Sequence, residues 1–331
     1  MTRALVTGAN GFIGANIVRD LLRRDVDVRA LCRAGSDRSS LEGLPIEVFE
    51  GDIRDPRSLD RGMAGCSLVF HAAALYSFWV RPRRLIYDVN VGGTRNVLDA
   101  AVRAGVDKVV YTSSVAAVGH RPDGRPADET VVARRDDVIG DYKKSKLEAE
   151  SVAAAYAKRL PVVIVNPSFP VGPWDTKPTP TGRTILDVID RRMPAYLDTA
   201  MNVVDVEDVA VGHWLAAERG RAGERYILGA ENVTMKDLVR IVAEFAKVPV
   251  PRVRLPRVPI LALAYVNAAF CAATGTRKPP RMTPDTVRMS AYPMVFDPSK
   301  AVEELGFPQT SAREALAKAV DWFVGGFRRG S

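Results

Sequence analysis

The feature that most constrains the fold of this chain is a glycine-rich turn that follows a short apolar segment at the N-terminus. The turn reads Val6-Thr7-Gly8-Ala9-Asn10-Gly11-Phe12-Ile13-Gly14, and a helical pattern follows it to about Arg24. Glycines at a strand-to-helix turn let the backbone approach a pyrophosphate, whose charge the free N–H groups of the helix attract. The spacing is G-x-x-G-x-x-G, not the commoner G-x-G-x-x-G, so the predicted dinucleotide site needs support from later segments.

The residue after the second predicted strand points to the cofactor. This strand covers residues 26–32 and ends before Arg33, nineteen positions after Gly14, near where such folds contact the adenosine ribose. An acidic side chain there would bind a 2′-hydroxyl, whereas an arginine grips a 2′-phosphate with its planar guanidinium. The sequence therefore favours NADP(H) over NAD(H). Arg38 is a candidate for a second phosphate contact, and the alternative is that both arginines are solvated loop charges.

Composition excludes several classes of protein. The 331 residues are 47% hydrophobic, enough for a large α/β domain and a smaller companion. No signal-peptide pattern is visible, and three widely spaced cysteines predict reduced thiols in a cytoplasmic protein. The net charge is +8, but the arginines are scattered without a DNA-reading motif, so we expect no nucleic-acid partner. The histidines have no metal-ligand spacing, so we expect no metal.

Short apolar segments alternate with helical patterns along the first half. Predicted strands cover residues 46–49, 68–71, 109–112 and 162–165, with predicted helices that include residues 89–104 and 144–159. This alternation predicts an α/β fold with a doubly wound parallel sheet of the Rossmann type. We predict a dinucleotide-binding domain over residues 1–166.

The second half is less regular. Prolines crowd residues 167–180 and 249–259, and helical patterns cover residues 184–192, 206–218, 234–245 and 312–323. We predict a smaller, mixed, mainly substrate-binding region over residues 167–331, with about residues 200–220 returning to the first domain.

A tyrosine and a lysine four residues apart, Tyr142 and Lys146, form the candidate catalytic pair. Residues at this spacing share one face of a helix, although alone the pattern is also typical of a solvated face. We expect the ammonium to lower the pKa of the phenol from about 10, which makes Tyr142 a usable proton donor or acceptor. Ser114, at the end of the preceding predicted strand, would hold the substrate oxygen. His71 is interpreted as a packing residue, because Tyr142 already supplies the acid or base.

Further runs stand in a characteristic order along the chain. They are Gly51-Asp52-Ile53, His71-Ala72-Ala73-Ala74, Asn90-Val91-Gly92-Gly93-Thr94, Thr112-Ser113-Ser114, and Asn166-Pro167-Ser168 leading to Gly172-Pro173. With residues 7–14, Tyr142 and Lys146, they resemble the extended short-chain dehydrogenase/reductase family over nearly the whole length.

The resemblance implies roles and a homodimer. Asp52 and Ile53 would bracket the adenine, and Ala72 and Ala73 would pass beneath the ribose and the pyrophosphate. Lys146 would also hold the nicotinamide ribose. The remaining implied cofactor-binding residues are Pro167 and Ser168, which would border the carboxamide, together with Ala74, Asn90, Thr112 and Tyr142.

Residues 177–183 and 193–196 resemble the dihydroflavonol-reductase-like branch, in particular proteins labelled hopanoid-associated sugar epimerases. Members that act on nucleotide sugars carry an arginine before the strand that leads into V-x-D. This chain has Met201 there, and a methionine cannot neutralise a diphosphate. The candidates that could substitute for that arginine from nearby are Lys177, Arg183, Arg191 and Arg192.

The expected function is NADP(H)-dependent hydride transfer between the nicotinamide and a secondary alcohol or ketone, above all reduction of a carbonyl. One alternative is a sugar epimerase that works through a transient keto intermediate. A second is a non-catalytic NADP(H)-binding sensor, which would be expected to lack Tyr142 or Lys146.

The substrate residues are aromatic. Candidates for a pocket lining are Tyr76, Phe78, Trp79, Phe169, Trp174 and Tyr196, and plain packing is the alternative for each. We expect a small-molecule substrate, and the hopanoid resemblance points to a lipid-linked or polycyclic one. Residues 258–276 carry no charge and are flanked by Arg257, Arg277 and Lys278. We interpret this segment as a buried helix of the substrate region, and peripheral contact with a membrane is the alternative.

Overall fold

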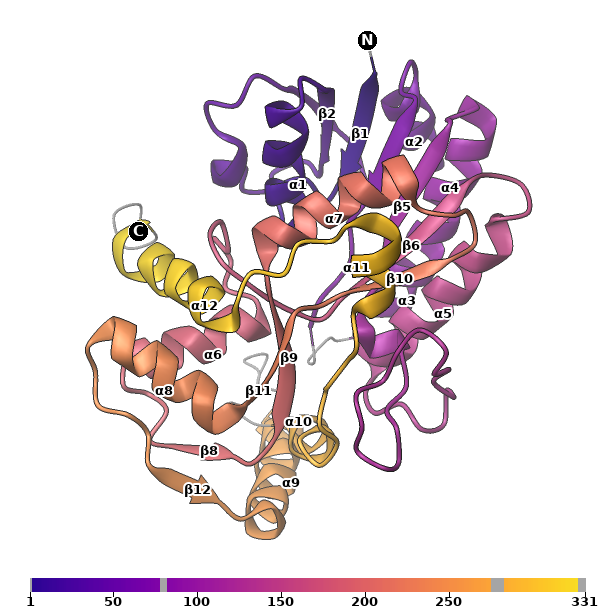
Figure 1. Ribbon diagram of the computed structural model, residues 1–331. Coiled ribbons are helices and arrows are strands. Elements are labelled where there is room, and N and C mark those ends of the chain that lie inside the picture. Colours follow the sequence, from indigo (N-terminus) through magenta and orange to yellow (C-terminus); the bar gives the residue numbers. More distant parts are fainter. Residues whose placement is uncertain (1, 78–81, 275–282, 327–331) are drawn as a thin grey trace.

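A seven-stranded parallel sheet forms the centre of the protein (Figure 1). The computed structural model describes residues 2–77, 82–274 and 283–326. The strand order is β10-β6-β5-β4-β1-β2-β3, and all neighbouring strands are parallel. These strands are β1 (Arg3–Thr7), β2 (Asp27–Cys32), β3 (Glu47–Glu50), β4 (Leu68–His71), β5 (Lys108–Thr112), β6 (Val162–Pro167) and β10 (Arg225–Leu228). The predicted doubly wound sheet is confirmed.

Helices cover both faces of this sheet, which explains why its central strands are apolar without alternation. All six residues of β6, for example, are buried. One face packs against α1 (Phe12–Arg23), α7 (Val206–Arg219) and α11 (Ser299–Leu305). The other face packs against α2 (Pro56–Met63), α4 (Gly93–Ala104) and α5 (Asp141–Tyr156). Figure 1 shows α1 and α7 side by side on the near face.

Several predicted helix boundaries shift. The helix predicted over residues 144–159 is α5, which begins at Asp141, whose carboxylate lies in the first turn, where the helix dipole favours negative charge. The helix predicted over residues 184–192 is α6 (Pro180–Ile189), because the side chain of Thr179 accepts a hydrogen bond from the backbone of Gly182 and caps it earlier. The helix predicted over residues 89–104 is preceded by α3 (Arg84–Tyr87), and its first turn is the π-helical η2 (Asp88–Gly92). Short 3₁₀ turns are η1 (Ser39–Leu41) and η3 (Val115–Ala117).

A second region lies beyond the carboxyl ends of the large sheet. Its three-stranded mixed sheet has the order β11-β9-β7, and β12 pairs with β8. These strands are β7 (Phe169–Val171), β8 (Ala195–Leu197), β9 (Ala200–Asp205), β11 (Glu231–Thr234) and β12 (Val253–Leu255). Helices α6, α8 (Met235–Ala246) and α12 (Ala312–Asp321), which η4 (Trp322–Gly326) follows, share one apolar cluster and group together in Figure 1.

The second half also returns to the large sheet. Helix α7 packs on α1, β10 extends the sheet beside β6, and α11 packs on α7 and β10. The part of the second half that packs with the first domain is therefore larger than the predicted residues 200–220, because it also includes β10 and α11. The division at residue 166 into two domains stays a prediction.

Helix α9 (Arg257–Thr274) and helix α10 (Pro284–Met289) lie together at the base of the second region in Figure 1. The sequence-based interpretation of a buried helix is wrong: Val258, Leu263, Val266 and Phe270 of α9 are each more than 60% exposed. The reason is that α9 packs mainly against the short α10 and so buries only a narrow face. Within the described residues, no helix is long and apolar enough to cross a membrane.

Candidate active site

The strand order places the candidate site. Successive strands run outward from β1 to β3 on one side, and from β4 to β6 on the other, so the order reverses between β1 and β4. In open parallel sheets, ligands bind in the crevice at the carboxyl ends of the strands at such a reversal. Thr7, His71 and Thr112 end β1, β4 and β5 at this edge.

The glycine turn after β1 is packed too closely for side chains. Gly8 has φ +67°, and a Cβ there would lie 2.7 Å from the backbone of Ala73. A Cβ on Gly14 would lie 2.1 Å from the carbonyl oxygen of Gly8. Both positions therefore require glycine. The turn is also tied to β4, because the backbone N–H of Ala73 donates to the Thr7 hydroxyl at 3.2 Å.

The N-terminus of α1 can receive an anion. Gly11 precedes the helix without a side-chain cap, and the first turn, which Phe12 and Ile13 open, has no acidic residue. Its free N–H groups and positive dipole end favour a negatively charged group. Asn10 links the glycine turn to the loop after β2, because its amide donates to the backbone oxygen of Asp37 at 2.7 Å. The residues present therefore fit the pyrophosphate of a dinucleotide.

Cationic side chains gather where the adenosine end would lie. Arg33 is exposed directly after β2, and its charge helps to hold the pKa of Asp52 below its usual value, although the hydrogen bonds from Arg54 contribute most. Among the described residues, no carboxylate forms a salt bridge with Arg33. The guanidinium of Arg38, in contrast, pairs with Glu50 at 2.9 Å. Arg33 is therefore the more available of the two arginines.

Asp52 and Ile53 lie in the loop after β3. The carboxylate of Asp52 pairs with Arg54 at 2.7 Å. Ile53 is buried, and a Cβ on Gly93 at the start of α4 would lie 2.5 Å from its side chain. The loop is thereby fixed against α4, since Asn96 also donates to the backbone oxygen of Ile53 at 3.0 Å.

Ser114, Tyr142 and Lys146 converge at the end of β5. Ser114 caps η3 by accepting a hydrogen bond from the backbone of Ala116, and its side chain also hydrogen-bonds Tyr142. Lys146, one turn further along α5, is buried and donates to the backbone oxygen of Thr112 at 2.7 Å. Helix α5 and the end of β5 together thus bring a phenol, a hydroxyl and an ammonium to one edge of the sheet.

The expected lowering of the phenol pKa is wrong. Burial raises the pKa of Tyr142 to about 12, and the hydrogen bond with Ser114 only partly opposes this. Burial also lowers the pKa of Lys146 to about 8. The ammonium donates to the backbone oxygen of Thr112 at 2.7 Å and to the hydroxyl of Tyr111 at 3.4 Å.

A buried polar network behind these residues is not evident from the sequence. The amide of Asn166 donates to the backbone oxygen of Ser114 at 3.0 Å and to the carboxylate of Glu150 at 2.7 Å. Glu150 in turn pairs with Arg225 at 2.9 Å, so α5, β6 and β10 are linked. One signal was available: Glu150 is four residues after Lys146 and so shares its helix face.

Three expected cofactor-binding side chains are already engaged with protein groups. The amide of Asn90 exchanges hydrogen bonds with the backbone of Leu75 and donates to Ser145. The hydroxyl of Thr112 pairs with His213 at 2.8 Å, and that of Ser168, after the buried end of β6 at Pro167, donates to Asn202. These contacts hold the site together.

The ring of His71 is buried between two hydroxyl groups. Nδ1 lies 2.7 Å from Thr7 Oγ1, and Nε2 lies 3.0 Å from Thr94 Oγ1. Burial lowers the pKa of His71 to about 3, so it stays neutral near pH 7. The interpretation of His71 as a packing residue agrees with this environment. Ala72, Ala73 and the exposed Ala74 follow it along the edge of the sheet.

The described substrate candidates lie in three separate places. Tyr76 lies beside the catalytic candidate, with its ring centroid 4.6 Å from that of Tyr142. Phe169 and Tyr196 instead pack against the apolar cluster of α6, α8 and α12. Trp174 is held between the guanidinium of Arg19, 3.4 Å from its ring centroid, and the ring of Trp322. Phe78 and Trp79 lie outside the described residues.

Asp175 is a buried carboxylate that the sequence did not single out. Its oxygens accept hydrogen bonds from the backbone and the hydroxyl of Thr179. Burial is the main cause that raises the pKa of Asp175 to about 6. Its negative charge adds to the effect of burial in raising the pKa of Tyr76. Asp175 therefore holds the loop before α6 and places a titratable group near the aromatic pair.

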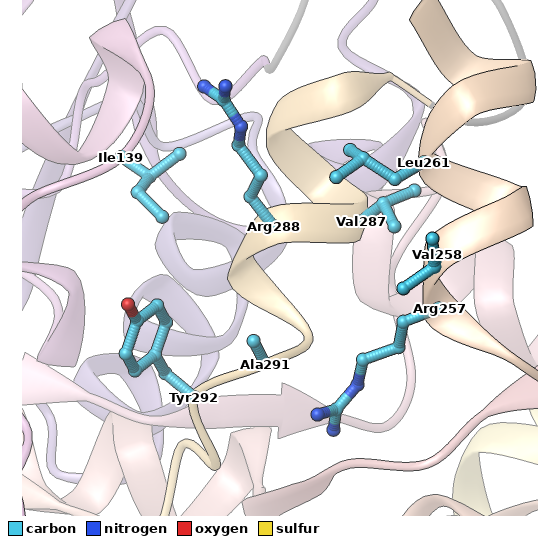
Figure 2. Close-up of a pocket in the computed structure, with 8 residues that line it drawn as sticks. All are labelled: Ile139, Arg257, Val258, Leu261, Val287, Arg288, Ala291 and Tyr292. Carbon is cyan, nitrogen blue, oxygen red and sulfur yellow. The ribbon is translucent and has the colours of Figure 1, made fainter.

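An apolar pocket of about 420 Å³ opens between α9, α10 and the loop before α5 (Figure 2). Its apolar lining includes Ile139, Val258, Leu261 and Val287. Figure 2 shows Ile139 and Tyr292 on one side of α10, with Leu261 and Val258 on the other. Ile139 belongs to the loop before α5 and stands three residues before Tyr142 in the sequence.

Comparison with known proteins agrees with this geometry. Residues 4–229 match the model of the NAD dependent epimerase/dehydratase family. A Synechocystis protein with the provisional name dihydroflavonol 4-reductase is 47% identical, over 96% of this chain and 93% of its own. Sterol demethylase protein B of Methylococcus capsulatus is 38% identical, over 96% of this chain and 97% of its own. The crystal structure of gox2253 has a TM-score of 0.88 and 45% identity, and covers 99% of each chain. The protein therefore belongs to the NAD-dependent epimerase/dehydratase family, the extended short-chain dehydrogenases/reductases, whose members are nicotinamide-dependent oxidoreductases, epimerases or dehydratases.

Proposed function

We propose that the protein is an NADP(H)-dependent reductase that converts a carbonyl group to a secondary alcohol. The observation that carries the proposal is the convergence of Ser114 and Tyr142 at the end of β5, where Ser114 acts on the pKa of the phenol and Lys146 lies one helical turn away. The glycine turn after β1 lies at the same edge of the sheet and fits a pyrophosphate.

The raised pKa of Tyr142 suits the reductive direction. With a pKa of about 12, the phenol stays protonated near neutral pH and can donate its proton. Ser114 and Tyr142 would hydrogen-bond the carbonyl oxygen, and Tyr142 would transfer its proton to that oxygen as the alcohol forms. The chemistry that a reduced nicotinamide would supply when bound is the hydride for the carbonyl carbon. Lys146 would stabilise the phenolate until it regains a proton from solvent.

Arg33 supports NADPH as the cofactor. Its exposed guanidinium follows β2 without a salt bridge in the described part of the chain, so it is available to a 2′-phosphate. A reductase also benefits from a cofactor pool that is kept reduced. The name of the matching family mentions NAD, so the preference for NADP(H) is part of this proposal.

An apolar ring system is the proposed substrate class. Two relatives carry the names of a flavonol-related reductase and of a sterol demethylase protein, and both names refer to fused-ring molecules. The ring of Tyr76 packs against that of Tyr142 at a tilt of 36°, and the pocket of Figure 2 is lined mainly by aliphatic side chains. Such surfaces suit a polycyclic or lipid-linked carbonyl compound.

A sugar epimerase has less support from the residues. Met201 on β9 is buried in the apolar cluster, so it offers no charge to a diphosphate. Lys177 lies near Asp37, and Arg192 pairs with Asp187 and Asp190, whereas Arg183 and Arg191 are exposed. The cations that could replace the missing arginine are therefore partly committed to carboxylates.

The test is an assay of NADPH oxidation with a panel of carbonyl compounds: a dihydroflavonol, a sterol ketone, a cinnamoyl thioester and an oxidised nucleotide sugar. We expect NADPH loss matched by alcohol formation with one of the apolar ketones. In a separate incubation of a nucleotide sugar with NAD⁺ or NADP⁺, formation of an isomer with no net reduction of the cofactor would establish the epimerase instead. Tight cofactor binding without turnover of any compound would favour the sensor.

The homodimer and the cytoplasmic location remain proposals. Sedimentation of the purified protein at several concentrations would give its oligomeric state, and fractionation of cells would give its location. A monomer at all concentrations would refute the dimer, and recovery outside the cytoplasm would refute the location.

A further inference from the structure

Helix α9 presents an apolar face that nothing in the described structure covers. At 100° per residue, one continuous face of this helix consists of Val258, Pro259, Ala262, Leu263, Val266, Ala269 and Phe270. Val258 is 81% exposed and Val266 is 67% exposed. We call these seven residues the outward face. It contains no charged or hydrogen-bonding side chain, which is unusual for a surface helix in water.

The opposite face of α9 attaches it to the protein. Ala264 and Cys271 are buried, and Ile260 and Leu261 are half-buried. This packing is mainly against α10 and leaves the outward face pointing away from the body of the molecule. The helix is therefore held in a fixed orientation with its apolar side toward the surroundings.

The region around α9 is strongly basic. Between residues 250 and 290 the sequence has a single acidic residue, Asp285. The basic residues in the same stretch are Arg252, Arg254, Arg257, Arg277, Lys278, Arg281 and Arg288. Arg257 opens α9, and the others precede or follow the helix in the sequence; Arg252 and Arg288 are exposed, whereas Arg254 pairs with Asp198. An apolar face between positive charges matches a surface that is apolar inside and negative outside.

We propose that α9 lies flat on an anionic lipid bilayer, with the outward face among the upper acyl chains and the exposed Arg252 and Arg288 near the lipid headgroups. A helix of 18 residues is about 27 Å long, which suits an in-plane position. Because Val258 belongs both to the outward face and to the lining of the pocket in Figure 2, docking places that pocket next to the lipid surface.

A second copy of the same chain fits this face less well. Basic residues stand at both ends of α9, so either antiparallel or parallel pairing of two copies would bring like charges together. The charge pattern therefore favours anionic lipid over self-association through α9.

The experiment is flotation of the full-length protein with vesicles of phosphatidylcholine, with or without phosphatidylglycerol. The test variant carries Val266→Glu and Phe270→Glu. The matched control is Val132→Glu, since Val132 is also an exposed valine, at 73%, but lies outside α9. NADPH titration of each variant checks that the fold is retained.

We expect the unaltered protein and Val132→Glu to float with the phosphatidylglycerol vesicles. The double variant should bind at least about tenfold more weakly, because two charges would have to enter the apolar layer. Equal flotation of the double variant would overturn the proposal, since the +8 net charge alone would then explain adsorption. Absence of flotation by the unaltered protein would also overturn it. So would a dimer of the unaltered protein that the double variant no longer forms, because the outward face would then be a contact between two copies of the chain.

Discussion

The side-chain amide of Asn166 donates a hydrogen bond to the backbone oxygen of Ser114 at 3.0 Å. Asn166 is fully buried near the end of β6, and its amide also donates to Glu150 on α5. The position of Ser114 therefore depends on a neighbouring strand and on the helix that carries Tyr142 and Lys146. Such a network fixes the position of Ser114, which follows β5, relative to Tyr142 and Lys146 on α5.

Replacement of Tyr142 by phenylalanine tests the proton donor. Tyr142→Phe keeps the ring beside Tyr76 and removes the hydroxyl, so we expect turnover to fall by about 10²-fold or more, with NADPH affinity nearly unchanged. Steady-state assays and a fluorescence titration of NADPH measure the two quantities. Tyr156→Phe is the matched control, because Tyr156 lies on the same helix and donates to Asp99. Near-normal turnover in Tyr142→Phe would remove Tyr142 from the mechanism.

Replacement of Arg33 by alanine tests the choice of cofactor. Arg33→Ala should weaken NADPH binding by about 1.5–3 kcal/mol, the range for hydrogen bonds to charged groups, and leave NADH almost unchanged. Isothermal titration with each cofactor provides the comparison. Arg103→Ala, on α4 and paired with Asp60, is the control for loss of a surface arginine. If both cofactors lose affinity equally, Arg33 is structural.

Replacement of Glu150 by glutamine tests how the network acts on Lys146. The Glu150 carboxylate raises the pKa of Lys146 and so opposes the effect of burial. Glu150→Gln removes that charge, so the pKa of Lys146 should fall further below 8, and the alkaline limb of the kcat/KM profile should move to lower pH. Glu148→Gln is the control, since Glu148 pairs with Arg135 on the exposed side of α5. An unchanged pH profile in Glu150→Gln would refute this role.

The buried histidines predict how stability depends on pH. Burial lowers the pKa of His71 to about 3 and that of His213 to about 4. Below pH ~6.5 the unfolded chain takes up protons on these residues and the folded chain does not, so each histidine makes the free energy of unfolding decrease as the pH falls. The contribution is at most about 1.4 kcal/mol per pH unit for each. Asp175 has the opposite effect. Its pKa is raised to about 6, so the folded chain takes up this proton at a higher pH than the unfolded chain, and the free energy of unfolding increases as the pH falls through 6.

Comparison of variants isolates the histidine contribution. Urea unfolding of His213→Gln between pH 4.5 and 6.5 should show a slope against pH that is smaller than that of the unaltered protein. The exposed His120 provides the control, and His120→Gln should leave the slope unchanged. A slope in His213→Gln equal to that of the unaltered protein would mean that His213 is not buried as a neutral ring.

Features that depend on neighbouring residues could be predicted from the sequence. The glycine turn, the alternation of strands and helices, and the spacing of Tyr142 and Lys146 are all local patterns. Backbone sterics and side-chain periodicity act over a few residues, so these patterns determine the parallel sheet and the edge at which the candidate site lies. Helix boundaries were less accurate, because capping contacts such as that of Thr179 compete with periodicity.

Features that depend on distant residues were decided only by the tertiary structure. The Asn166–Glu150–Arg225 network joins three elements, and Trp174 contacts both Arg19 of α1 and Trp322 of η4, which are far apart in the sequence. The pKa of Tyr142 rises because packing removes water, an effect that a Tyr–Lys spacing does not contain. The exposure of α9 likewise depends on what packs against it. Burial and solvation are properties of the assembled fold, and for this reason the sequence alone misjudged them.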